Sequence, residues 1–425
     1  MHDDTIIDIL QSKVFPTLGC TDPVVVAYGA SMARDAIKGR ITKVSITADK
    51  NIYKNAHRVT IPKTNLQGLA YACALGLMGG KSQYQMQVLQ DIDEQDIARA
   101  MDLVESKVIT THVRKQPGLF VEITLLTDDG CSRCRIEGSY TNITLLEADN
   151  QTILTAKKSD QIEKDHPDLC ELTIDRIFKF VDQCPLEKLA FIEDGCRMNL
   201  NIAEAGLLKY NGRYFGQGLK KIAGECTCGA NPIMYAKILT AAAADMRMDG
   251  VDLPVMATAG SGNQGITGLV PIVAVAKLKN SSRESTIRAA SLSHLITIYI
   301  KERIGILSQV CGCSVAAGAG ASAGIAYLLG GDQATAEGAV TTTVGGLAGM
   351  ICDGAKSSCA FKLSISAGIA VEAALLALEG VGITARDGIV ADTLEQTIEN
   401  LAFISREGMS DVDDSILRLM HDMEE

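Results

Sequence analysis

The hydrophobic pattern of this 425-residue chain changes near residue 172, and the change limits the folds available to it. Between residues 118 and 148, apolar and polar residues alternate in short runs, which is the period of a half-buried β-strand. After residue 172 the apolar residues, many of them Ala, recur at helical spacing between Gly-rich loops. We therefore expect an α+β protein, with an N-terminal α/β domain over residues 1–170 and an all-α domain over residues 171–425.

The N-terminal domain should contain a small antiparallel sheet. Residues 41–49 alternate as a strand does, and Asp129-Gly130 is typical of a hairpin turn between two further strands. The polar stretch 150–170 is expected to be the loosest connection in the chain. The expected helices are 5–15, 22–38, 66–79, 93–106, 172–182, 198–209, 232–248, 285–302, 312–329, 334–345, 363–378 and 391–404.

Composition argues against several classes of function. The formal net charge is −11, and because an acidic chain repels phosphate backbones, we expect no nucleic-acid partner. The first ten residues contain neither a basic nor an apolar segment, so we expect no secretory signal and a cytoplasmic protein. Residues 304–331 carry no charge, but Gly, Ala, Ser and Cys favour a buried helix over a membrane span. Gly/Ala-rich helical faces are compatible with a homodimer.

Four of the 13 cysteines lie in two short motifs of the helical half. Cys311 and Cys313 flank one glycine, and Cys352 and Cys359 flank the sequence DGAKSS. Without export, disulfides are a poor explanation for them. Thiolates from two loops could hold an iron–sulfur cluster, which tolerates wide spacings, whereas the spacing does not match a structural zinc site. From spacing alone, however, buried core cysteines are the better interpretation.

A Gly-rich turn, GSGNQG at residues 260–265, formally matches the dinucleotide-binding fingerprint. Its context is poor, because the preceding strand is weak and an acidic ribose ligand is represented only by Glu284. Free backbone N–H groups at the start of the following helix would suit a carboxylate or phosphate, and Ser261 and Asn263 could add hydrogen bonds. A packing turn between helices explains the motif equally well.

Two pairs of charged residues lie in apolar surroundings: Asp245 with Arg247, and Asp353 with Lys356. Buried charges need partners. Structural ion pairs between helices would supply them. Because both pairs stand next to Gly-rich loops, they are also candidates for a site that binds a zwitterion.

Six motifs follow one another along the chain: GCTDP (19–23), NIYKNA (51–56), MNLNIAEAGL (198–207), AGSGNQGIT (259–267), CGCSVAAGAGASAG (311–324) and MICDGAKSSCAFK (350–362). Together they resemble the L-cysteine desulfidase family, which is related to the iron–sulfur L-serine dehydratases. The resemblance implies a cytoplasmic lyase with a [4Fe–4S] cluster that converts L-cysteine into pyruvate, ammonia and sulfide. L-serine dehydration is the near alternative. A non-catalytic, thiol-rich redox or metal-sensing protein is the alternative from another class.

The resemblance also implies roles for individual cysteines. The cluster ligands would be Cys352, Cys359 and either Cys311 or Cys313, and the relatives' spacing slightly favours Cys311. Cys20, in the first motif, would be the base that removes the α-proton. The reactive centre is therefore expected between the two domains.

The substrate would be a small amino acid, held mainly by backbone and polar side chains. The Gly-rich turn would hold its carboxylate, and Asp353 or Asp245 its ammonium group. The sequence departs from the family at His57 and Lys63, where Met and Gly are usual. The candidate substrate-binding residues are Thr21, Asp22, Ser261, Gly262, Asn263 and Asp353.

Overall fold

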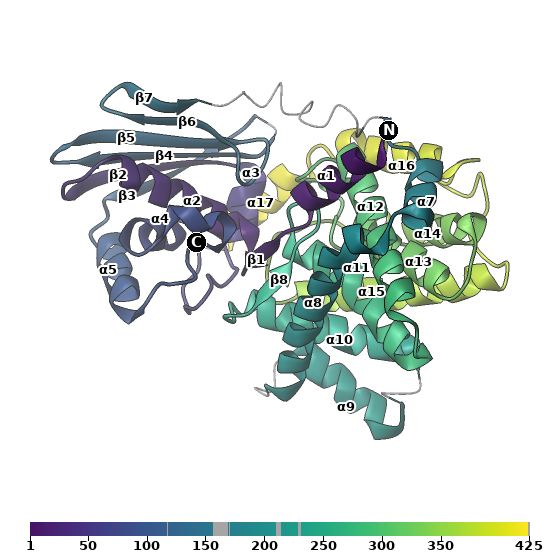
Figure 1. Ribbon diagram of the computed structural model, residues 1–425. Helices are drawn as coiled ribbons and strands as arrows, with labels where there is room; N and C mark the ends of the chain where they lie inside the picture. Colours follow the sequence, from purple (N-terminus) through teal and green to yellow (C-terminus); the bar gives the residue numbers. More distant parts are fainter. Residues whose placement is uncertain (117, 156–168, 170, 210–213, 228–230, 424–425) are drawn as a thin grey trace.

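The computed structural model describes residues 1–116, 118–155, 169, 171–209, 214–227 and 231–423, side chains of 225–227 excepted. Figure 1 shows two bodies side by side, one built around a β-sheet and the other from helices. The predicted α+β class is confirmed, because the sheet lies in the N-terminal half and the C-terminal half is helical. Of the predicted connection 150–170, residues 151–155 form a strand, whereas 156–168 and 170 lie outside the described residues.

The sheet has six strands in the order β3-β2-β4-β5-β6-β7. The strands are antiparallel except β2 and β3, so the sheet is larger than predicted and mixed. The parallel pair follows from connectivity, because three α-helices and the 3₁₀-helix η1 separate β2 from β3 along the chain. The hairpin turn predicted at Asp129-Gly130 joins β4 to β5. The strands are β2 (Ile41–Asp49), β3 (Ile109–Arg114), β4 (Phe120–Thr127), β5 (Gly130–Glu137), β6 (Ile143–Ala148) and β7 (Gln151–Thr155).

Helix α2 covers one face of this sheet, and it contacts β4, β5 and β6. Helix α4 packs on α2 at very short range, because a Cβ atom at Gly76 would lie 2.2 Å from the carbonyl oxygen of Ala27. Only glycine therefore fits at position 76. The helices of this body are α2 (Thr21–Ala36), α3 (Lys50–Ala56), α4 (Leu69–Met78), the 3₁₀-helix η1 (Ser82–Gln87) and α5 (Glu94–Glu105).

The second body surrounds the small-residue helix α13, which contacts α11, α12, α14 and α15. Cβ atoms at Gly320 and Gly324 would lie about 2.5 Å from backbone oxygens of α12, so the Gly-rich sequence permits close helix packing. Its elements are α7 (Ile174–Gln183), η3 (Leu186–Leu189), α8 (Ala190–Leu208), α9 (Phe215–Thr227), α10 (Pro232–Met248), α11 (Gly262–Lys279), α12 (Arg283–Ile304), α13 (Val315–Leu328), α14 (Gln333–Leu347), α15 (Cys359–Leu378), α16 (Leu394–Phe403), η4 (Ile404–Gly408) and α17 (Val412–Asp422).

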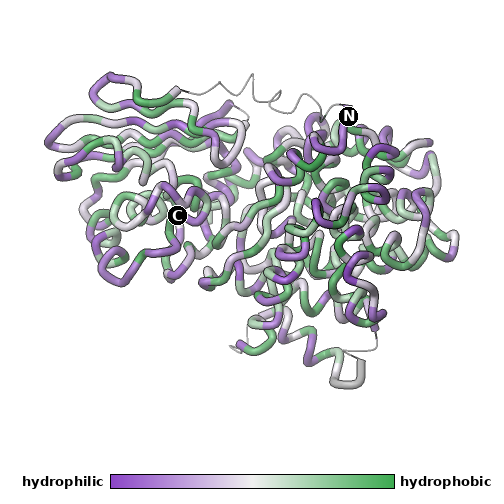
Figure 2. The backbone as a smooth tube through the Cα atoms, in the orientation of Figure 1, coloured by the Kyte–Doolittle hydropathy of each residue, from purple (hydrophilic) through white to green (hydrophobic). Residues whose placement is uncertain are grey.

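Helix α15 is, among the described residues, the one helix long and apolar enough to cross a membrane by length and composition alone. It packs against α10, α13 and α14 inside the helical body. In Figure 2, hydrophobic and hydrophilic segments alternate along the helices of this body. Helix α15 is therefore a core helix of this fold.

Both ends of the chain tie the two bodies together. Helix α1 (Asp3–Lys13) packs in the hydrophobic core of the helical body. The next strand, β1 (Pro16–Leu18), pairs antiparallel with β8 (Pro254–Met256) before the chain enters the sheet-containing body. At the other end, α17 returns to contact α3 (Figure 1).

Candidate active site

A pocket lies where the two bodies meet, and it collects residues from distant parts of the sequence. Thr21, Asn55 and Tyr140 line it from the sheet-containing body, and the two cysteine motifs line it from the helical body. Of the predicted site residues, Gly262 and Asp245 are not part of the lining. The predicted residues in the lining are Cys20, Thr21, Asp22, Ser261, Asn263, Cys311, Cys313, Cys352, Asp353 and Cys359.

The two cysteine motifs are held together by backbone pairing. Val310 and Ile351 form an antiparallel β-bridge. The backbone N–H of Cys311 donates to Met350 O at 2.8 Å, and that of Cys352 donates to Gln309 O at 2.7 Å. This pairing places two loops, about 40 residues apart in sequence, side by side on one wall of the pocket.

The surroundings of Cys311, Cys352 and Cys359 favour the protonated thiol. The neighbouring Cys313 thiol and burial raise the pKa of Cys311, and the Cys311 thiol and burial hold the pKa of Cys352 well above its usual range. Burial raises the pKa of Cys359 to about 11. Because metals bind thiolates, loading a cluster would release these protons.

The chemistry of the donor set fits an iron–sulfur cluster. Within the described ranges, no group of three or more His, Cys, Asp or Glu side chains is arranged to hold a single metal ion. A four-iron cluster is larger than one ion, and its thiolate ligands stand farther apart. A buried cation, Lys301, also faces the thiols, and its Nζ donates to Ser308 Oγ at 3.2 Å. Its charge would offset that of thiolates.

Cys20 lies at the N-cap of α2 and lines the pocket, where Cys359 packs in the same apolar cluster. Its thiol donates to Asp22 Oδ2 at 3.6 Å, and the Tyr140 hydroxyl donates to Asp22 Oδ1 at 3.0 Å. Burial raises the pKa of Cys20, and it raises the pKa of Asp22 to about 6. Cys20 is thus a protonated thiol with a carboxylate beside it.

The turn before Cys20 is specific to glycine. Gly19 has a φ of +67°, and a Cβ atom there would lie 2.1 Å from Pro62 Cγ. The turn therefore brings the chain against Pro62 and directs Cys20 into the pocket.

The Gly-rich turn begins α11 at the pocket wall. Ser261 is the N-cap residue, and its Oγ lies 3.5 Å from Cys313 Sγ. Asn263 is buried, and its Oδ1 has no hydrogen-bond partner. The preceding strand β8 has only three residues in a two-stranded sheet, which differs from a dinucleotide-binding fold. The N-terminus of α11 instead presents backbone N–H groups to the pocket, as an anion site would.

Of the two charged pairs noted in the sequence, Asp245 and Arg247 separate in space, whereas Asp353 and Lys356 stay together. Asp245 and Arg247 are two positions apart on α10, so they point to different sides of the helix. Asp245 accepts a hydrogen bond from Gly216 N at 2.8 Å and lies outside the pocket lining, whereas Arg247 lines the pocket. Asp353 also lines it, and its carboxylate forms an ion pair with Lys356 at 2.6 Å.

Several lining residues were not predicted from the sequence. Asn51 and Asn55 belong to the NIYKNA motif, and their i, i+4 spacing on α3 places both on one face of that helix. The NIYKNA motif could therefore have indicated Asn51 and Asn55 as pocket residues. Tyr140, Gln264 and Lys301 also line the pocket. Gln264 belongs to the Gly-rich motif, which could have indicated it, whereas the neighbours of Tyr140 and Lys301 in the sequence carry no such signal.

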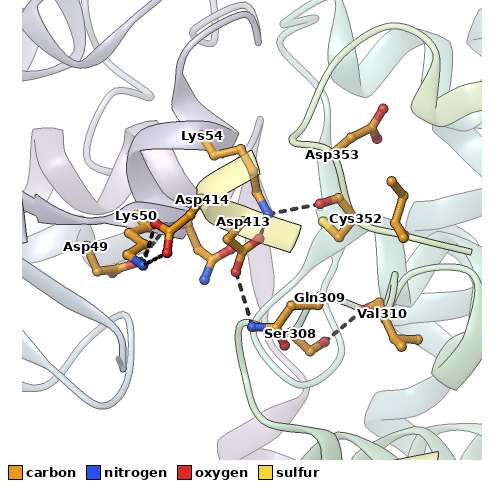
Figure 3. A network of polar contacts seen from close by, with 12 residues as sticks. Asp49, Lys50, Lys54, Ser308, Gln309, Val310, Cys352, Asp353, Asp413 and Asp414 are labelled. Carbon is orange, nitrogen blue, oxygen red and sulfur yellow. Dashed lines mark hydrogen bonds and ion pairs between the residues drawn. The ribbon is translucent and has the colours of Figure 1, made fainter. Parts of the chain in front are cut away.

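A buried ion pair is hydrogen-bonded to the loop that carries Cys352 (Figure 3). Lys54 of α3, whose side chain is 0% exposed, pairs with Asp413 of α17 at 2.5 Å. The same Nζ donates to Cys352 O at 2.9 Å, and Gln309 Nε2 donates to Asp413 Oδ2 at 3.3 Å. Helix α17 therefore connects the sheet-containing body to both cysteine loops.

Comparison with known proteins gives a family for this architecture. The model of the family described as "Serine dehydratase alpha chain" matches residues 83–418. The chain belongs to this family. It is also 40% identical to a UPF0597 protein of Clostridium tetani and to UPF0597 protein TTE0269 of Caldanaerobacter subterraneus, over 99% of each chain. It is 39% identical to UPF0597 protein DP0591 of Desulfotalea psychrophila, over 97% of each chain.

The predicted relationship to serine dehydratases is thereby confirmed. Membership in the serine dehydratase family supports a lyase of the serine dehydratase type. The family match spans both cysteine motifs and the Gly-rich turn. Cys20 precedes residue 83, and the full-length UPF0597 relatives extend over that part of the chain.

Proposed function

We propose that this protein is a cytoplasmic [4Fe–4S] lyase that eliminates sulfide from L-cysteine. One observation carries the proposal: four cysteines from two paired loops share a pocket with a fifth, Cys20, from the other body. A member of the serine dehydratase family with this donor set has both a site for a cluster and an acid–base group opposite it.

Cys311, Cys352 and Cys359 are the proposed cluster ligands. Cys311 is preferred to Cys313 because its thiol interacts with those of both Cys313 and Cys352, so it lies between them. Cys313 instead lies beside Ser261 Oγ. When bound through three thiolates, the cluster would supply a Lewis-acidic iron for the departing sulfur of the substrate.

The residues of the chain would handle the protons. The Cys20 thiol first passes its proton to Asp22, which already accepts its hydrogen bond. The Cα–H bond of L-cysteine then breaks with the proton going to Cys20 Sγ, and its electron pair forms a Cα=Cβ bond. The Cβ–S bond breaks and releases sulfide. The aminoacrylate product takes up water and yields pyruvate and ammonia.

The remaining pocket residues would orient the substrate. Ser261 and Asn263, at the start of α11, suit the carboxylate, and Thr21 lies beside the base. An ammonium group at Asp353 would have to replace one of the lysines that pair with it. Asp245 lies outside the pocket lining, so it is not part of this proposal.

L-serine is the second candidate substrate, and the name of the matching family favours it. The same residues would remove the α-proton, and hydroxide would leave in place of sulfide. The discriminating measurement is pyruvate release by anaerobically purified protein from L-cysteine and from L-serine, with iron and acid-labile sulfide measured in the same sample. Cluster-loaded protein that releases pyruvate from neither substrate would contradict the lyase proposal and favour a redox or metal-sensing role.

The ligand assignment has a separate test. Cys352→Ala should lose the cluster, because two thiolates do not hold it. Cys311→Ala should behave in the same way, and Cys313→Ala, two residues away on the same loop, should keep its iron. Full iron content in Cys311→Ala together with loss in Cys313→Ala would reverse the assignment.

A further inference from the structure

The guanidinium of Arg247 is a buried charge in the pocket with unpartnered hydrogen-bond donors. Arg247 is 2% exposed and lines the pocket near the C-terminal end of α10. Its Nε and Nη2 atoms are buried without a hydrogen-bond partner, and it forms no ion pair with any described residue. The Asp22 carboxyl interacts with Arg247 electrostatically but makes no direct ion pair. A buried guanidinium with unpartnered hydrogen-bond donors is costly, so folds rarely keep one unless a ligand completes it.

The fold makes room for this side chain. A Cβ atom at Gly262 would lie 2.4 Å from Arg247 Nε and 2.9 Å from its Cζ. Gly262 is the first residue of α11, directly after Ser261. The glycine predicted to bind substrate thus serves another purpose, since its missing side chain lets the guanidinium reach the end of α11.

Two positively polarised groups then converge on one part of the pocket. The backbone N–H groups at the start of α11 are there, with the guanidinium packed against them. Arg247 also lies close enough to Cys20 and Asp22 to lower the pKa of both groups. A small anion bound at Arg247 would therefore lie within reach of the proposed base.

We propose that Arg247 is the residue that binds the α-carboxylate of the substrate, in a cradle that Gly262 keeps open. The inference rests on the proposed lyase function and adds the counter-ion that a zwitterionic amino acid requires. Guanidinium groups match carboxylates with two parallel hydrogen bonds. The carboxylate would also accept N–H groups from the start of α11.

A purely structural arginine would behave differently in the absence of ligand. Replacing a residue that stabilises the fold lowers the melting temperature. Replacing an unpaired buried cation with an apolar residue of similar length removes a desolvation cost instead. Arg247→Met should therefore leave the melting temperature of ligand-free protein unchanged or raise it, while it abolishes carboxylate binding.

The experiment uses anaerobic, cluster-loaded protein with matched iron content. L-alanine has the α-carboxylate and amino group but no leaving group, and L-alaninamide differs from it only in a neutral amide. L-alanine should raise the melting temperature of the wild type, and L-alaninamide should not. In Arg247→Met the two compounds should have equal, negligible effects. KM for L-cysteine should rise roughly 10- to 100-fold, as expected for losing charge-assisted hydrogen bonds.

Two further variants complete the test. Gly262→Ala should displace the guanidinium and raise KM in the same direction. Gly346→Ala is the matched control, because a Cβ atom there meets no atom within 4 Å, and it should leave KM unchanged. A wild-type response to L-alanine that survives in Arg247→Met would overturn the inference. The melting-temperature response to L-alanine needs no turnover. It can therefore be measured even if the protein proves not to be a lyase.

Discussion

At the scale of single residues, burial sets the chemistry of the pocket. Cys20 is 2% exposed, and burial keeps its thiol protonated by raising its pKa. The adjacent Asp22, whose pKa is raised to about 6, stays mostly ionised at neutral pH and can accept the thiol proton. Cys20, the proposed base, could act as one only because a proton acceptor lies beside it.

Cys20→Ser tests the role of this thiol. Serine keeps the size and the hydrogen bond to Asp22, but its hydroxyl is a far weaker acid than a thiol. We expect normal iron content and turnover reduced by at least about 100-fold, which is the low end of a general-base contribution. Cys131→Ser, in the hairpin of the sheet, is the control and should keep full activity. Turnover by Cys20→Ser at the wild-type rate would reject Cys20 as the base.

Asp245 links pH to stability. Burial raises its pKa to about 6 from 3.8, so the folded protein binds this proton more tightly than the unfolded chain. The stabilisation is complete below about pH 4 and is lost as the pH rises through about 6, by about 3 kcal/mol at most. Asp245→Asn keeps an acceptor for Gly216 N but cannot ionise.

Urea unfolding at two pH values checks this expectation. Relative to the wild type, Asp245→Asn should be more stable near neutral pH than in mild acid. Asp194→Asn, at an exposed carboxylate, is the control and should show the same stability difference at both pH values. An Asp245→Asn difference that does not change with pH would contradict the expected proton binding.

At the scale of elements, α17 stabilises the site although none of its residues lines the pocket. Asp413 reaches Lys54 on α3, and Lys54 in turn donates to the carbonyl of Cys352 (Figure 3). A buried pair of this kind adds little net stability, but removing one partner leaves an uncompensated charge. Its role is therefore to fix position, here of a proposed ligand loop relative to the opposite body.

Lys54→Met and the double variant Lys54→Met/Asp413→Leu separate these effects. The single variant should lose about 3–5 kcal/mol of unfolding free energy, and the double variant should recover most of it. Lys50→Ala breaks the more exposed pair with Asp414 and should cost no more than about 1 kcal/mol. Chemical denaturation measures all three. Equal losses in the single and double variants would show that the pair does not act as a unit.

At the scale of the whole molecule, the site exists only while the two bodies stay together. Ile306 and Leu307, from the loop before the CGC motif, pack against the core of the sheet-containing body. The β1–β8 pair and the contact between α17 and α3 add two further links. Cys20 and the cysteine loops come from different bodies, so any separation would open the pocket between the proposed base and the proposed cluster ligands.

Removing residues 409–425 should weaken this connection without touching the pocket lining. We expect calorimetry to resolve two unfolding transitions in the shortened protein, where the full chain unfolds in one, because Lys54 loses its partner and α3 its covering helix. The shortened protein should also lose iron faster in air. A single transition at the melting temperature of the full chain would show that α17 is not needed to join the bodies.

The local sequence was sufficient for the fold class, and its motifs supplied many of the residues that line the candidate pocket. Hydrophobic period depends on neighbours a few residues away, so it identified the strands of 118–148 and most helices after residue 172, but not α9. The sequence motifs identified the cysteines and the Gly-rich turn as candidate site residues. Periodicity did not predict α17, and its contact with α3 depends on residues hundreds of positions apart.

Long-range packing decided the rest. Asp245 and Arg247 are both charged residues in an apolar stretch of sequence, yet helix geometry turns Asp245 away from the pocket and leaves Arg247 in it with unpartnered hydrogen-bond donors. Cys20 meets the cysteine loops because β1 pairs with β8 and brings the start of α2 against the helical body. Such contacts arise from burial and chain crossing between distant segments, so residue spacing along the chain does not record them.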